Sequence, residues 1–224
     1  AAWAPALLTN ARNTDILPGN PGFLDASEGC EILQKPEGPV DRSQGDVHPL
    51  GNPHYWTDPE NGRQVARNIA RRLAELDPDS KAEFASNLGR FEVALDRKLE
   101  EWRKLAAPLR GVQAVTYHNS WPNFARRFAI EIVDYVEPRP GVPPSPAHLR
   151  RLIEQMRKKK VPLILMETYW DPKIPEKTAR EGGAALVIFP ASVGGEPPIK
   201  TYFDLFDNNL KKLVAALRMG DASR

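Results

Sequence analysis

The second half of the chain alternates between short apolar runs and amphipathic stretches, and this alternation constrains the fold more than any other feature. After Gly111, each apolar run of strand length is followed by a helix start signal or by helical periodicity. Strands are predicted at 113–117, 131–136, 162–167 and 184–189, and helices at 122–128, 146–159, 173–181 and 202–219. Strands joined through helices require crossover connections, so we expect an α/β fold with a mostly parallel sheet and helices on both faces.

Two amphipathic helices are predicted before this region. Apolar residues recur at helical spacing between residues 60 and 76, and Asp77 and Pro78 then begin a second helix that continues to about residue 105. At 1.5 Å per residue the second helix is about 40 Å long, which is enough to connect two lobes.

The first 58 residues are rich in Pro, Gly, Asn and Asp, which favour loops over helices. Only a short helix near residues 3–10 and a strand near residues 30–33 are expected. So much loop makes a poor independent domain, and the chain begins without Met. We therefore expect three parts: a remnant of an N-terminal lobe at 1–58, a helical segment with the interlobe connector at 59–110, and a C-terminal α/β lobe at 111–224. An N-terminal part with an export signal is expected to be absent from the chain.

Composition excludes several classes of protein. The 31 basic and 29 acidic side chains give a formal charge of +2, so no strong field favours nucleic acid. The basic run at 157–160 ends a predicted helix, where cations complement the helix dipole. Cys30 is the single cysteine, which excludes an internal disulfide and a Cys-rich zinc finger. No run approaches the roughly 18 apolar residues of a membrane-spanning helix.

Two segments each place a histidine among aromatic residues just before a helix start. His54 lies in the sequence GNPHYW and His118 in TYHNSW. Both are predicted on connections that lead into helices, and such connections line the ligand clefts of α/β proteins. Neutral imidazole is a common ligand of Zn²⁺, so the two histidines predict two halves of one metal site. On spacing alone, structural histidines bonded to backbone are an equally open interpretation.

Three further side chains are candidate metal ligands: Glu167, Glu137 and His48. Glu167 ends the apolar run LILM, and a carboxylate there needs a partner, although it could instead cap the next helix. Glu137 lies just past another predicted strand, and His48 shares the Pro-rich loop of His54 but is predicted to lie on the surface. His148, in the first turns of the 146–159 helix, is predicted to face solvent. The chain has no Gly-x-Ser-x-Gly elbow that would indicate nucleophilic catalysis.

Four motifs, in order, carry a resemblance to a known family: GNPHYWTDP at 51–59, TYHNSW at 116–121, VEPRPGVPPS at 136–145 and YFDLFDNN at 202–209. Together they resemble the periplasmic solute-binding proteins of zinc and manganese ABC importers, the metal-binding cluster A-I type. The resemblance implies two α/β lobes of mostly parallel sheet, joined by a long rigid connector helix, with the metal between the lobes. The first lobe would be incomplete in this chain.

The resemblance also implies a ligand set and a function. His54 matches the ligand of the first lobe, His118 the ligand at the start of the second lobe, and Glu167 a further ligand that is histidine or glutamate depending on the branch. The family's first histidine would precede residue 1, and its late acidic ligand would fall near Ala191 and Ser192, where no carboxylate stands. The implied cargo is Zn²⁺, with Mn²⁺ as the alternative. The implied partner is an ABC permease in the membrane.

The implied protein is not an enzyme. It is expected to be a monomer that acts in the periplasm or outside the cell, with a lipid anchor as one form of attachment, and to have neither nucleic acid as a partner nor a transmembrane segment. Two alternatives remain at this point: a zinc-dependent hydrolase that uses His54, His118 and a carboxylate, and a surface adhesin that is stabilised by its metal.

Overall fold

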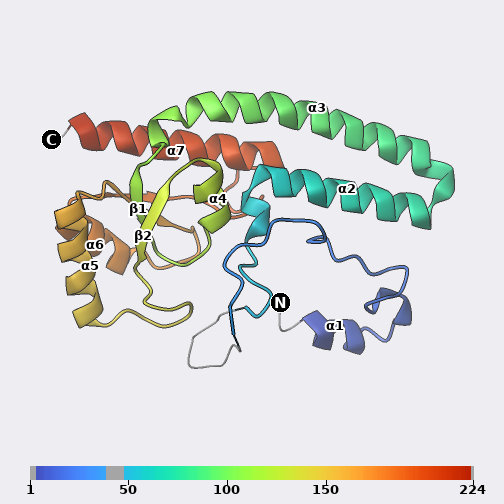
Figure 1. Ribbon diagram of the computed structural model, residues 1–224, viewed down its shortest axis with the longest axis horizontal. Coiled ribbons are helices and arrows are strands. Elements are labelled where there is room, and N and C mark those ends of the chain that lie inside the picture. The colour runs from blue at the N-terminus through green and yellow to red at the C-terminus, as the bar shows by residue number, and fades with distance from the viewer. Residues whose placement is uncertain (1–3, 39–47, 223–224) are drawn as a thin grey trace.

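The computed structural model describes residues 4–38 and 48–222 and contains a parallel sheet, which lies on the left in Figure 1. Its strands are β1 (Gln113–Thr116), β2 (Glu131–Tyr135), β3 (Leu163–Met166) and β4 (Ala185–Ile188), in the order β2-β1-β3-β4. All neighbouring strands pair in parallel. The predicted α/β class and parallel sheet are confirmed, and each strand is one or two residues shorter than predicted.

Helices cover both faces of the sheet, as the alternation predicted. Leu165 of β3 belongs to an apolar cluster with Phe206, and this cluster contains residues of α3 (Lys81–Leu105), α4 (Pro122–Arg127) and α7 (Tyr202–Ala222). The neighbouring Ile164 belongs to a second cluster with Leu152, formed with α5 (Pro146–Lys159) and α6 (Lys173–Gly182). Successive strand side chains point to opposite faces, so the sheet has a separate core on each side.

The longest helix is α3, which lies over both α2 (Pro59–Leu76) and α7 in Figure 1. Its 25 residues correspond to about 37 Å. The predicted second helix is confirmed from Lys81, preceded by a 3-10 turn at Pro78–Ser80. Asp207 of α7 accepts hydrogen bonds from Lys98 Nζ at 2.7 Å and from Trp102 Nε1 at 2.6 Å, which hold α3 against α7.

The described part of the first 58 residues is largely irregular. It contains α1 (Ala4–Asn10) and 3-10 turns at Thr14–Ile16 and Tyr55–Thr57, and a further 3-10 turn, Ala107–Leu109, follows α3. The prediction of a strand near residues 30–33 is wrong, because the chain has no regular secondary structure there. There, Asn61 of α2 accepts from the backbone N–H of Glu31 at 2.8 Å and donates to its carbonyl at 3.1 Å. Asn123 of α4 also donates to this carbonyl, at 3.1 Å, so side chains of two helices, rather than a neighbouring strand, satisfy these backbone groups.

The division of the chain at residues 58 and 110 stays a prediction. Among the described residues, no helix is both long and apolar enough to cross a membrane.

Candidate metal centre

The candidate site lies at the carboxyl edge of the sheet, where the chain changes direction. The connection after β1 leads to β2 on one side, and the connection after β3 leads to β4 on the other side. A crevice therefore opens between the ends of β1 and β3, where ligands bind in open α/β sheets. His118 lies just beyond β1, and Glu167 directly follows β3. The predicted placement of both residues at strand ends is confirmed.

His54 reaches the same place from outside the sheet. It precedes the 3-10 turn Tyr55–Thr57, and its backbone N–H and ring Nδ1 both lie 3.0 Å from Oδ1 of Asn52. Asn52 also donates to the carbonyl of Asn119 at 2.8 Å, so it ties the His54 loop to the loop after His118. With Nδ1–H donating to Asn52, the lone pair of His54 is left on Nε2.

His118 is oriented by a carboxylate. Its Nδ1 lies 2.6 Å from Oε2 of Glu137, a side chain that is only 5 % exposed. A carboxylate at this position selects the Nδ1–H tautomer and fixes the orientation of the ring, which are roles of outer residues around metal-bound histidines. Glu137, a weak candidate ligand in the sequence, is therefore in contact with His118 rather than free to bind a metal by that oxygen.

The two imidazoles meet edge to face. Their ring centroids are 5.9 Å apart with an interplanar angle of 77°. Burial, followed by the charges of His118 and His48, lowers the pKa of His54 to about 4, so its ring is neutral at physiological pH. Both rings border a cavity of about 160 Å³ that is lined by Gln34, His48, Gly51, Asn52, Pro53, His54, His118, Asn119 and Pro140.

Glu167 is the most unusual buried group near the site. Glu167 is 0 % exposed, and among the described residues neither of its carboxylate oxygens finds a hydrogen-bond partner. Burial raises its pKa, and the nearby Ser120 hydroxyl and His118 oppose the shift only in part. The hydroxyl oxygen of Ser120 itself also lacks a partner. An unpaired buried carboxylate is costly, and it fits a site that a cation completes.

A complete ligand set is not assembled. Within residues 4–38 and 48–222, no three His, Cys, Asp or Glu side chains are arranged to hold a metal ion. The structure brings His54 and His118 together and places His48 in the wall of the same cavity. Glu167 is not part of the lining described for this cavity, although it lies close enough to His118 for the two to interact electrostatically. The ligand roles of His54, His118 and Glu167 remain predictions.

Two other residues correct or extend the sequence analysis. His148 does not face solvent: it is 8 % exposed, and its Nε2 lies 3.0 Å from the carbonyl of Tyr135. Helix α5 covers the sheet, which turns this position inward. Sequence reasoning also missed Asn52, although an Asn two residues before His54 is a known signal for a side chain that bonds its own backbone.

Comparisons with known proteins identify the family of the chain. Residues 2–216 match the family described as ZnuA, the periplasmic component A of the zinc-uptake complex. The metal ABC transporter substrate-binding lipoprotein SsaB of Streptococcus sanguinis is 29% identical over 224 residues, which cover 96% of this chain and 68% of SsaB. The manganese ABC transporter substrate-binding lipoprotein scaA of Streptococcus gordonii is 27% identical over 223 residues, with the same two coverages.

A solved structure, described as the crystal structure of ZnuA, has a TM-score of 0.70 and 26% identity. The alignment covers 86% of this chain and 69% of that one. The family match spans almost all of the chain, and the fold agrees with it. The chain therefore belongs to the ZnuA family, that of the substrate-binding proteins of metal ABC transporters.

Proposed function

We propose that this protein captures Zn²⁺ between His54, His118 and Glu167 and delivers it to an ABC-type permease. The observation that carries the proposal is the pair of imidazoles with centroids 5.9 Å apart, each with Nδ1 next to a side-chain oxygen. This arrangement leaves two Nε2 lone pairs beside one cavity. No covalent step is involved, because the task is reversible ligation.

Zinc is favoured over manganese by the kind of donors. Two imidazoles and one carboxylate suit Zn²⁺, whereas Mn²⁺ prefers more oxygen ligands. The carboxylate of Glu137 behind His118 is the outer-shell arrangement that is common at zinc sites. The description of the family names zinc uptake, whereas the name of scaA gives manganese as its metal. The identity of the metal must therefore be measured.

Glu167 is proposed as the third ligand because a cation would compensate its unpartnered oxygens. His48 is the rival third ligand, because it lines the cavity with both other histidines. Neither the hydrolase nor the adhesin alternative gains support from the described residues. SsaB and scaA are named lipoproteins, and the family is described as periplasmic. We infer from these names that the protein acts outside the cytoplasmic membrane. We also propose that it acts as a monomer.

Isothermal titration of the metal-free protein with Zn²⁺ and Mn²⁺ tests the proposal. We expect tighter binding of Zn²⁺, and a loss of affinity of at least about 100-fold in His54→Ala and His118→Ala, since each removes a direct ligand. Glu167→Gln should weaken binding more than His48→Ala, and the reverse order would assign the third position to His48. Unchanged zinc affinity in His118→Ala would contradict the proposal.

A further inference from the structure

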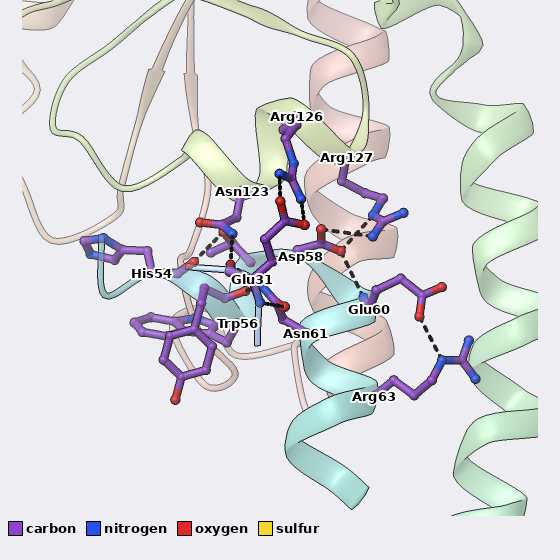
Figure 2. A network of polar contacts seen from close by, with 12 residues as sticks. Glu31, His54, Trp56, Asp58, Glu60, Asn61, Arg63, Asn123, Arg126 and Arg127 are labelled. Carbon is purple, nitrogen blue, oxygen red and sulfur yellow. Dashed lines mark hydrogen bonds and ion pairs between the residues drawn. The ribbon is translucent and has the colours of Figure 1, made fainter. Parts of the chain in front are cut away.

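Helix α4 is connected to both histidine loops. Its first residue, Pro122, follows the His118 loop directly, and its last residue, Arg127, reaches the His54 loop. The guanidinium of Arg127 binds the carboxylate of Asp58 with two contacts, Nε to Oδ1 at 2.7 Å and Nη2 to Oδ2 at 3.0 Å (Figure 2). One short helix therefore holds both loops that carry the imidazoles.

Asp58 connects the Arg127 contact to the turn that carries His54. It lies four residues after His54, is 2 % exposed, and also caps α2 by accepting from the backbone N–H of Glu60 at 2.9 Å. A buried carboxylate in a two-contact pair with arginine has a narrow choice of geometry. The turn between His54 and α2 is therefore fixed relative to α4.

Further contacts restrain the same region. Tyr202 of α7 donates its hydroxyl to the carbonyl of Trp56 at 2.6 Å, and Trp56 Nε1 donates to the carbonyl of Ala191 at 2.8 Å. Figure 2 shows a parallel contact of α4, in which Arg126 pairs with Glu31. Among these contacts, the Arg127–Asp58 pair joins the His54 turn directly to the helix that begins at the His118 loop.

We infer that Arg127 and Asp58 are a positioning pair that sets the separation of the His54 and His118 imidazoles. Neither residue lines the cavity of the two histidines, so the pair acts through the backbone of the turn at 55–57. The consequence for metal affinity rests on the proposed function. The consequence for the distance between the rings concerns the metal-free protein and can be measured separately.

The experiment compares wild type with Arg127→Met, Arg127→Lys and the double variant Asp58→Asn/Arg127→Met. The double variant removes both charges of the pair, so neither is left buried without its partner, and it keeps a residue that caps α2 well, so it is designed to fold. Lys98→Met is the matched control, because it removes an ion pair of 2.7 Å between α3 and α7, away from both histidine loops. Two readouts are taken: the nuclear Overhauser effect between the His54 and His118 ring protons without metal, and the dissociation constant for Zn²⁺.

In both Arg127→Met variants we expect the cross-peak between the rings to disappear and the Kd for zinc to rise by about 10-fold or more, as is typical of outer-shell changes. Arg127→Lys should retain part of the cross-peak intensity and part of the zinc affinity. Lys98→Met should lower the melting temperature without changing the cross-peak or the zinc Kd. A cross-peak and a zinc Kd like those of wild type in the double variant would overturn the inference, as would equal losses in Lys98→Met. If wild type binds no zinc, the proposed function fails, while the cross-peak still decides the role of the pair.

Discussion

Replacing Glu167 with methionine is expected to make the metal-free protein more stable. Within the part of the chain that the structure describes, the wild-type carboxylate is 0 % exposed and neither of its oxygens has a hydrogen-bond partner, so folding removes it from water with only partial compensation from the nearby Ser120 hydroxyl and from His118. Methionine has a similar shape and no charge. An unsatisfied buried polar group costs about 1–3 kcal/mol, and we expect the free energy of unfolding to rise by an amount of that order.

Glu137 provides the matched control, because it is also buried but has a partner. Its Oε2 lies 2.6 Å from Nδ1 of His118. Glu137→Met removes this acceptor and leaves the N–H of a partly buried ring without its carboxylate, so the free energy of unfolding should fall by about 1–3 kcal/mol. Two substitutions of the same kind, at two buried carboxylates, are thus expected to have opposite signs.

The effect of Glu167→Met should depend on pH. Burial raises the pKa of Glu167 above the usual 4.5. The stability contributed by this group is therefore complete below pH 4.5 and is lost as the pH rises through the raised value. The gain of the methionine variant over wild type should accordingly be largest at neutral and alkaline pH and should shrink in acid.

Urea denaturation in the presence of a chelator, at pH 5 and pH 8, measures both effects. The same variant should bind zinc more weakly than wild type, so stability and affinity should change in opposite directions. A Glu167→Met protein that is less stable than wild type at pH 8 would contradict this prediction, because the carboxylate would then have a stabilising partner in the folded state.

Three further predictions follow from the described contacts. Gly62→Ala should destabilise the protein by about 1–3 kcal/mol in urea denaturation, because the added Cβ would collide with the hydroxyl of Tyr202. Gly89→Ala in α3 should instead stabilise the protein by about 0.5–1 kcal/mol, because no described atom lies within 4 Å of the added Cβ. His148→Leu should cost about 1–2 kcal/mol in the same assay, because it removes the contact with the carbonyl of Tyr135, and no loss would contradict its buried position. Zinc at 100 times its Kd should stabilise the protein by about 2.7 kcal/mol, with full reversal by a chelator, and no shift in melting temperature would argue against binding to the folded state.

Local periodicity was sufficient to predict the strands and helices after residue 111 and the long helix before it. The strands were predicted slightly too long: β1 and β2 end one residue earlier than expected, and β3 and β4 are one residue shorter at each end. The strand near residues 30–33 could not be rejected from sequence, because the asparagine that satisfies Glu31 lies in α2, far along the chain. Contacts between distant segments also turned His148 inward.

Strand and helix periods are properties of neighbouring residues, so the parallel α/β fold and the positions of His118 and Glu167 at strand ends could be predicted from local sequence patterns. The folded arrangement was needed to show that His54 lies against His118, that Glu137 orients one ring, and that Glu167 has no hydrogen-bond partner among the described residues. These facts depend on how α2, α4 and the strand ends pack together. Such packing brings together residues that are far apart in the sequence, and the periodicity of neighbouring residues carries no information about these contacts.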